Sequence, residues 1–470
     1  MSKRFRAWKI DEPLVLPVTV ADFVDEEHLA RFVLNLVQED IDLTAIIGTY
    51  GSERGQPPFH PVMMTALLLY SYCCGIYASR RIGSACRERV DFMSIVGLDA
   101  PDFRTVSDFR KRHLPVLGKL FGQILHLCET AGLVKLGHVA LDGTKIRANA
   151  SKHKAMSYER MENRAAELEA EVAKWLAAAE AADAAEDKLY GRDKTGDELP
   201  DWVVDKKLRA EKIRRAKAEL EAEAKAAAEA KLKAEAEAAE KRAAEGRRKP
   251  GRPAAPPSGE PEAKAQKNFT DPESRIMKSK DGFVQAYNAQ AAVDAEAQII
   301  VAHDVTQCPV DSGQLVPMTD AIEVNLGRQP AQLSADAGYC SEANLKALES
   351  RNIDAYVATG RARDAVTGTA EGAASTTTSQ AEPESAQTRV EAMRAKIKAG
   401  GHASPYRLRK QLPEPVFGQI KQARGFRQFL LRGFERVRGE WAIVCTAHNL
   451  LKLAHSRNLS DTSPMPAGAG

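Results

Sequence analysis

The chain has 470 residues, of which 44% are hydrophobic and 28% are charged, and its formal net charge is +3. This length is sufficient for two or three domains with separate hydrophobic cores. Because the net charge is so small, the overall balance does not indicate a nucleic-acid partner, and any surface that binds DNA must be local.

Nothing in the sequence predicts a secreted or membrane protein. The basic residues 1–13 are not followed by the apolar core of a signal peptide. Residues 61–77 form the longest apolar stretch, but they are too few to span a bilayer and include polar side chains, so we expect a buried helix. The cysteines show no CxxC spacing, which suits reduced thiols. We therefore expect a cytoplasmic protein without a membrane partner.

Residues 1–133 are predicted to form an all-α N-terminal domain that binds DNA. Apolar residues recur at helical spacing in 25–37 and again in 116–133. Between them, Thr105 or Ser107 is expected to cap a short helix. This helix would offer three cations to DNA phosphates: Arg110, Lys111 and Arg112. The alternative is a basic face that is merely solvated.

A second domain begins with a core segment, 134–156, that is interrupted by a long insertion at 157–266. Residues 139–142 predict its first strand, and the next two strands are expected only at 283–294 and 297–305. Two Ala/Glu-rich helices, from 158 to about 187 and from 202 to about 245, predict an antiparallel hairpin with a second arm of roughly 65 Å. A Pro/Gly linker follows, and its RRKPGRP stretch resembles short hooks that enter AT-rich minor grooves, with an ordinary basic linker as the alternative.

The catalytic core is expected to continue through residues 267–360. After the strands come a helix at 312–325, a strand within 332–339, a helix at 341–351 with Ser341 as its N-cap, and a strand within 353–360. Residues 361–400 contain almost no large apolar side chain and predict a mobile linker. Residues 401–455 predict a basic C-terminal helix that ends the core, and 456–470 a disordered tail.

Without the insertions, the element order is strand, strand, strand, helix, strand, helix, strand, helix. This α/β order is that of an RNase-H-like mixed sheet flanked by helices, in which the first and fourth strands are parallel neighbours. Asp142 ends the first strand and Asp336 the fourth, so their carboxylates should meet at one sheet edge. Such oxygen ligands suit Mg²⁺, and two ions about 4 Å apart promote phosphodiester cleavage. Lys145 and Arg147 would then lie beside the DNA backbone.

Each aspartate also has a simpler interpretation, because Asp before Gly is a common turn former. Asp304 ends the third strand, points elsewhere in this topology, and is expected to be structural.

Three stretches, 139–151, 333–345 and 405–433, resemble the acidic blocks of bacterial insertion-sequence transposases with a DDE catalytic domain. Residues 59–82 and 105–113 resemble the helical N-terminal domain of the same group. The resemblance implies that Asp142, Asp336 and Glu414 are catalytic and bind two Mg²⁺ ions, for which Mn²⁺ is expected to substitute. It also implies a nucleoid-associated enzyme, expected to act as a homodimer, that cleaves double-stranded DNA at element ends and joins them to target DNA.

The third block departs from the family pattern at one position. The residues that match the pattern are Tyr406, Arg409, Glu414 and Lys421. Four residues separate Arg409 from Glu414, whereas the family pattern has three. Because proline is tolerated only in the first turn of a helix, the helix should begin near Pro413. Glu414 then lies in the first turn, where the helix dipole favours its ionised form, and Arg409 belongs to the preceding loop.

Residues 407–440 contain nine Arg or Lys and three Glu, and predict a face that contacts phosphates, including Arg424 and Arg427. Glu435 and Glu440 are the rivals of Glu414 as third acid. The alternative function is a catalytically inactive, transposase-derived DNA-binding protein or repressor, against which the intact acids argue. A coiled-coil scaffold would explain only the insertion.

Overall fold

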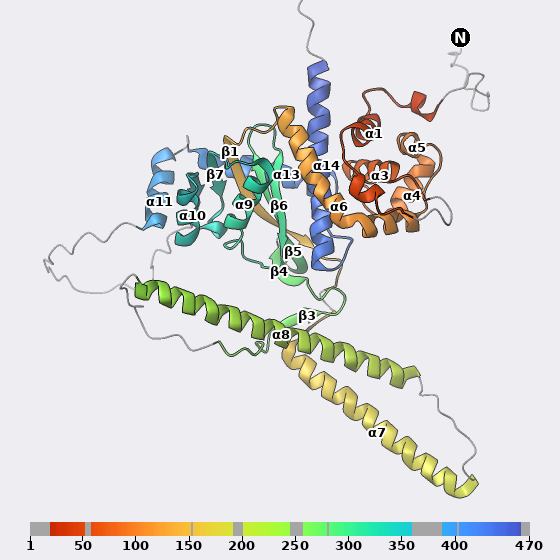
Figure 1. Cartoon of the computed structure of the whole chain (residues 1–470). Coiled ribbons are helices and arrows are strands. Elements are labelled where there is room, and N and C mark those ends of the chain that lie inside the picture. The colour runs from red at the N-terminus through yellow and green to blue at the C-terminus, as the bar shows by residue number, and fades with distance from the viewer. Residues whose placement is uncertain are drawn as a thin grey trace, which may run out of the picture.

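A mixed sheet flanked by helices forms the centre of the computed structural model, as predicted (Figure 1). The structure describes residues 19–51, 58–151, 154–190, 201–244, 257–279, 282–359, 388–401 and 404–461. The RRKPGRP stretch, most of the predicted mobile linker and residues 462–470 lie outside these ranges. No helix of the described residues is long and apolar enough to cross a membrane.

The N-terminal region is all-α, as predicted, over the described residues up to Thr130. Its elements are η1 (Val20–Phe23), α1 (Leu29–Glu39), α2 (Thr44–Ile47), α3 (Pro61–Cys73), α4 (Ser79–Glu88), α5 (Val90–Val96) and α6 (Phe103–Thr130). Helix α3 is the apolar stretch, and it is buried from Met64 to Cys73, which confirms that prediction. The predicted short basic helix is wrong: α6 has 28 residues, and its N-cap is Asp102, which accepts a hydrogen bond from the Thr105 amide at 2.7 Å.

The six-stranded sheet confirms the predicted strand neighbours. Its strands are β1 (His138–Arg147), β4 (Arg275–Ser279), β5 (Gly282–Asp294), β6 (Ile300–Thr306), β7 (Gln332–Ala335) and β8 (Asp354–Val357). They lie in the order β4-β5-β1-β7-β8, with β6 also paired to β5. Strands β1 and β7 are parallel neighbours, whereas β1 and β5 are antiparallel. The sequence did not indicate β4, which forms a hairpin with β5.

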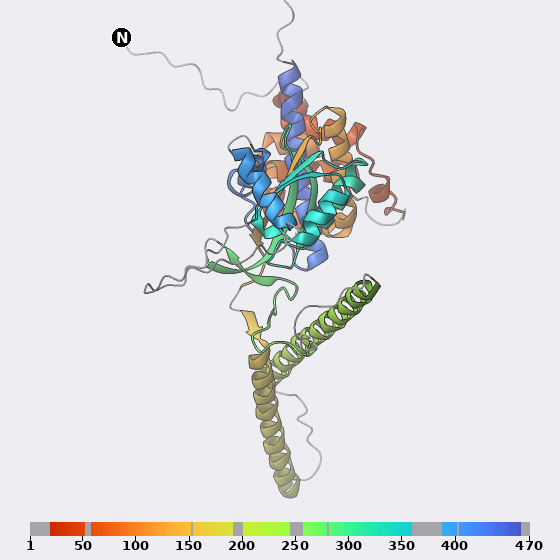
Figure 2. The same cartoon turned by 90° about the vertical axis from the view of Figure 1, so that its left-hand side faces the viewer.

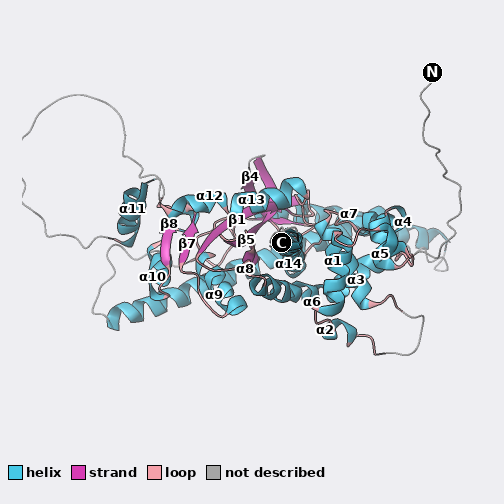
Figure 3. Cartoon of the chain, turned by 90° about the horizontal axis from the view of Figure 1, so that it is seen from above, coloured by secondary structure: helices cyan, strands magenta, loops and turns pink. Residues whose placement is uncertain are grey.

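Helices cover both faces of this sheet. Seen from above, α12 (Leu408–Gln411) and α13 (Pro413–Gly418) lie on one side, and α9 (Leu315–Leu326) and α10 (Glu342–Ser350) lie on the other (Figure 3). Ser341 caps α10 as predicted, because its hydroxyl accepts a hydrogen bond from the Asn344 amide at 3.1 Å. Helix α11 (Arg389–Gly400) corrects part of the predicted mobile linker, since a capping box at Thr388 and Glu391 starts a regular helix there.

The last helix, α14 (Phe434–Asp461), joins the two halves of the chain. It packs against α3 and α6 on one side and against β6 on the other, so one hydrophobic core crosses the predicted boundary at residue 133 (Figure 1). Helix α14 also continues into the predicted tail, through residues 456–461.

The insertion stands apart from this core on a narrow neck. Strands β2 (Ala155–Ser157) and β3 (Gln266–Asn268) pair antiparallel and form the neck. From it α7 (Tyr158–Tyr190) extends away from the sheet, whereas α8 (Asp201–Ala244) lies at an angle to α7, below the core (Figure 2). Ion pairs Glu171–Lys206 and Glu162–Lys217 confirm that the helices pair antiparallel. A small separate cluster includes Leu168, Ile213 and Leu220. The two arms therefore form a minor core of their own.

Candidate active site

Two of the predicted acids lie next to one another at the sheet edge. Parallel pairing of Leu141 with Ala335 makes the following residues, Asp142 and Asp336, neighbours on adjacent strands. Each carboxylate accepts a hydrogen bond from the next backbone amide, at 2.8 Å from Gly143 and 2.6 Å from Ala337. The predicted meeting of these two carboxylates is confirmed, although β1 continues to Arg147 through its pairing with β5, so Asp142 does not end its strand.

The carboxyl group of Asp142 has an unusual electrostatic environment. Burial raises its pKa to about 6, the amide of Gly143 opposes this shift, and the charges of Asp336 and Asp311 raise the pKa further. Anionic groups are thus held together here at an energetic cost that a cation would reduce.

Arg409 supplies a cation at this edge. Its guanidinium pairs with Asp336 (Nη1 to Oδ1, 2.8 Å) and lies over the ring of Tyr406 at 5.3 Å from the centroid. The prediction that Arg409 belongs to a loop is wrong, because Leu408–Gln411 form the short helix α12, which packs against β1 and β7. The extra residue before Glu414 therefore does not separate Arg409 from the acids.

Glu414 occupies the first turn of α13, which begins at Pro413 as predicted. Its side chain is exposed and forms no hydrogen bond or ion pair with the residues that the structure describes. Helix α13 packs against β1, yet among the described residues no group of three His, Cys, Asp or Glu side chains is arranged to hold a metal ion. The structure thus joins Asp142 with Asp336 and leaves Glu414 on a neighbouring helix.

The lysines near Asp142 lie on different faces of β1. Side chains alternate along a strand, so Asp142 and Thr144 share one face, and Gly143 and Lys145 share the other. Lys421 donates hydrogen bonds to the Thr144 hydroxyl and, at 3.0 Å, to the Lys145 carbonyl. The Lys145 ammonium instead lies 3.4 Å from Asp311. Lys421, and not Lys145, is therefore the lysine on the face of Asp142, which corrects the expectation from sequence.

Two of the predicted DNA-binding cations point into the protein. Arg110 is only 5% exposed and donates hydrogen bonds to the Tyr77 carbonyl and to two hydroxyl groups, which leaves it no access to DNA. Arg424 is half-buried and donates to His448 Nδ1 at 3.2 Å, and desolvation lowers its pKa. The other basic candidates on these segments are exposed: Lys111, Arg112, Arg147 and Arg427.

The rival acids have other roles in the structure. Glu440 is fully buried and accepts hydrogen bonds from the amides of Leu430 and Leu431, each at 3.0 Å. Glu435 is 80% exposed and lies 3.6 Å from Arg438. Asp304 accepts a hydrogen bond from the same arginine at 3.0 Å, in keeping with the structural role predicted for it.

One acid near the site was missed. Asp311, between β6 and α9, lies close to Asp142 and contacts the side chains of Asn288 and Gln290. Asp311 belongs to no local motif. The polar residues Asn288 and Gln290, at alternate positions of the largely buried strand β5, were the available signal.

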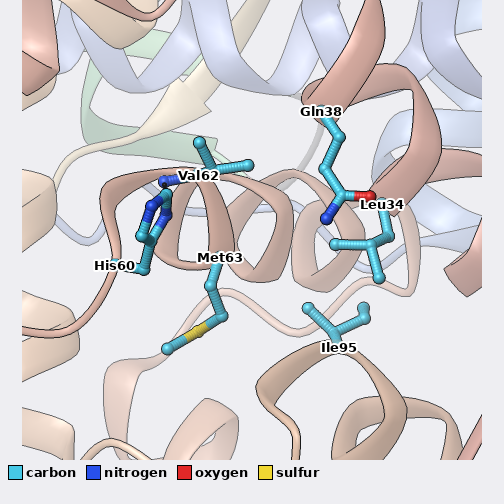
Figure 4. A pocket seen from close by; sticks show the side chains of 6 residues that line it. All are labelled: Leu34, Gln38, His60, Val62, Met63 and Ile95. Carbon is cyan, nitrogen blue, oxygen red and sulfur yellow. Dashed lines mark hydrogen bonds between the residues drawn. The ribbon is translucent and has the colours of Figure 1, made fainter.

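The described surface also has a hollow among the N-terminal helices, far from these acids in the sequence. It is lined mainly by apolar side chains of α1, α3 and α5 (Figure 4): Leu34, Gln38, His60, Val62, Met63 and Ile95. It contains none of the candidate site residues.

Two family models match the chain. One, described as a transposase domain (DUF772), matches residues 18–112, and the other, a transposase DDE domain, matches residues 365–454. Comparisons with curated proteins and with solved structures found no match. The first model covers α1 to α5 and the start of α6, and the second includes Arg409, Glu414 and Lys421. These two matches, one at each end of the chain, support an insertion-sequence DDE transposase.

Proposed function

We propose that this transposase binds the ends of its insertion sequence and cleaves and joins DNA strands with divalent ions held by Asp142, Asp336 and Glu414. The observation that carries the proposal is the placement of Asp142 and Asp336 on neighbouring parallel strands, with Arg409 paired to Asp336 at 2.8 Å. A catalytically inactive DNA-binding protein would have no use for two like charges held together in this way.

The proposal includes an RNase-H-like fold for the core. The strand order β6-β5-β1-β7-β8 supports it, because β5 is antiparallel to β1 and β6, and β7 and β8 continue the sheet in parallel. In such a sheet, acids at the ends of the first and fourth strands serve one site.

The three carboxylates are the type of ligand that Mg²⁺ prefers. Asp142 and Asp336 would hold the ions through hard carboxylate oxygens, and Glu414 would complete the set from the first turn of α13. A cationic guanidinium already lies against Asp336, which shows that this edge favours positive charge. The chemistry that such ions would supply is activation of the attacking oxygen and stabilisation of the leaving one. Mn²⁺ should replace Mg²⁺, because it accepts the same oxygen ligands.

The residues of the chain itself would hold and orient the DNA. Lys421 fixes the end of β1 beside Asp142 through Thr144. Arg409 holds Asp336 in place and would contact a phosphate when the strand approaches. The exposed cations Lys111, Arg112 and Arg427 would bind the backbone of the duplex further away. The proposal extends to a homodimer on double-stranded DNA in the bacterial cytoplasm.

The test is strand cleavage by the variants Asp142→Asn, Asp336→Asn and Glu414→Gln. Each variant keeps the size of the side chain but removes a charge that holds the ions, so each should cleave at least about 100-fold more slowly. The substrate is a duplex that carries the element's own end, in Mg²⁺, Mn²⁺ or EDTA, and DNA affinity is measured separately by gel shift. Affinity should be retained, and a double variant should be scarcely slower than a single one, because the acids act as a unit.

Glu435→Gln is the matched control, since Glu435 is an exposed acid in the first turn of α14. Cleavage that persists in EDTA contradicts the metal mechanism. A Glu414→Gln enzyme that cleaves at the wild-type rate, while Glu435→Gln does not, contradicts the choice of the third acid.

A further inference from the structure

The face of β1 opposite Asp142 rests on buried polar side chains instead of an apolar layer. Asn288 and Gln290 of β5 are fully buried and lie opposite Lys145 and Gly143 in the antiparallel pairing. Buried polar groups are costly unless they are hydrogen-bonded, so such a layer points to a specific arrangement.

Asp311 is the centre of this layer. One of its oxygens, Oδ1, accepts hydrogen bonds from Asn288 Nδ2 at 2.5 Å and Gln290 Nε2 at 2.9 Å, and lies 3.4 Å from Lys145 Nζ. Gly143 makes this approach possible, because a Cβ atom there would lie 2.8 Å from the same oxygen and 2.3 Å from Gln290 Nε2. Three side-chain donors thus converge on one carboxylate oxygen.

The same layer reaches the loop that carries Asp336. Asp336 is the N-cap of η3 (Ala337–Tyr339), and the Tyr339 hydroxyl, buried, donates a hydrogen bond to Gln290 Oε1. Asn344 ties the two loops together from α10, since its amide donates to the carbonyls of Ser312 and Tyr339, each at 2.7 Å. One amide, that of Gln290, thus joins Tyr339 of the Asp336 loop to Asp311.

We propose that Asp311 is a positioning residue of the active site, which acts through Gln290 and Tyr339 to hold the Asp336 loop in register with Asp142 on β1. The proposal rests on the proposed function above, because it assigns the network to the same pair of acids. Metal sites need such support: ligands must be held within about 0.5 Å of their working positions, and loss of an outer partner costs about 10- to 100-fold in metal affinity or activity.

The test compares Asp311→Asn and Tyr339→Phe with the control Asp304→Asn. Asp304 is a carboxylate of similar exposure on β6 that pairs with Arg438 and is not part of the network. Asp311→Asn keeps the shape of the side chain, and Tyr339→Phe removes only the hydroxyl, so folding should survive in at least one of them. Mn²⁺ affinity is measured by titration calorimetry, and cleavage is followed at saturating Mn²⁺.

We expect Mn²⁺ affinity to fall about 10- to 100-fold in Asp311→Asn and Tyr339→Phe, with DNA affinity within twofold of wild type. Without metal, amide hydrogen exchange in residues 336–340 should become at least about tenfold faster, as expected when a loop loses its anchor. Asp304→Asn should match wild type in all three measurements.

Wild-type Mn²⁺ affinity and wild-type exchange in both network variants would overturn the proposal, and so would equal losses in Asp304→Asn. Faster exchange of the loop with normal Mn²⁺ affinity in the network variants would also contradict it, since the network would then serve folding alone. If the wild type binds no Mn²⁺ and cuts no DNA, the proposed function fails instead, while the exchange measurement still decides whether Asp311 anchors the loop.

Discussion

Arg110 is a predicted DNA-binding residue whose contacts instead indicate a stabilising role. Its guanidinium lies inside the N-terminal region and donates hydrogen bonds to the Tyr77 carbonyl at 2.8 Å, and to the hydroxyls of Tyr72 and Ser79 at 3.2 Å each. The buried carboxylate of Glu440 also feels its charge. Arg110→Gln should therefore weaken folding and leave DNA contacts alone.

The expected cost follows from these contacts. A hydrogen bond to a charged group contributes about 1.5–3 kcal/mol, but the values are not additive within one side chain, and Arg110 Nε has no partner. Removing one charge from a buried set costs about 3–5 kcal/mol, because other groups are left unpaired. We expect the free energy of unfolding to fall by about 3 kcal/mol.

The matched control is Lys111→Gln, one residue further along α6. The Lys111 side chain is 54% exposed and lies 3.6 Å from Asp108, so its loss should change stability by no more than about 0.5 kcal/mol. If it contacts a phosphate, the slope of log affinity against log salt should fall by about one.

The assays are urea unfolding followed by circular dichroism and fluorescence anisotropy of labelled duplex DNA at several salt concentrations. An Arg110→Gln protein with wild-type stability and a smaller salt slope would refute the reasoning, because it would place Arg110 on the DNA and not in the core.

Three further outcomes are expected. Burial raises the pKa of Glu440 to about 7, above the ordinary value, so the stability that this group contributes is full below about pH 4.5 and is lost as the pH rises through 7. Melting temperatures from pH 5 to 8 should show a decline that is smaller in Glu440→Gln. Leu168→Ala removes a fully buried side chain from the minor core of the insertion, so proteolysis of α7 and α8 should accelerate while the main unfolding transition stays unchanged. Replacing residues 158–264 by a short Gly-containing turn should leave a folded core, because β2 and β3 are already paired antiparallel and a turn can join their ends; an insoluble product would contradict this.

Local sequence patterns were sufficient to predict those features that depend on residues close together in the sequence. Ser341 caps its helix, Pro413 begins α13, and the parallel neighbours β1 and β7 follow from the order of elements alone. The meeting of Asp142 and Asp336 could therefore be predicted from their positions after two apolar runs.

Packing between distant segments decided the rest. Arg110 shares a helical face with the buried residues Val106, His113 and Leu117. Its burial could therefore have been predicted from the helical spacing of apolar residues, whereas its charge alone suggested exposure. Strand β1 extends past Asp142 only because β5 pairs with it from much later in the chain. Asp311 had no local signal, since its partners come from β1 and β5.

The neck of the insertion has a consequence for how this chain is made. Strand β1 leaves the ribosome before the arms, and its partner β5 follows only after roughly 150 further residues, a separation that slows pairing. The arms, in contrast, contain mostly local contacts and form helices in microseconds. Once α7 and α8 pair, β2 and β3 come together and bring the waiting strand close to the emerging one. The arms thus shorten the search that the nascent core must complete. The unpaired strand is therefore exposed to misfolding for less time than it would be with an unstructured loop of the same length.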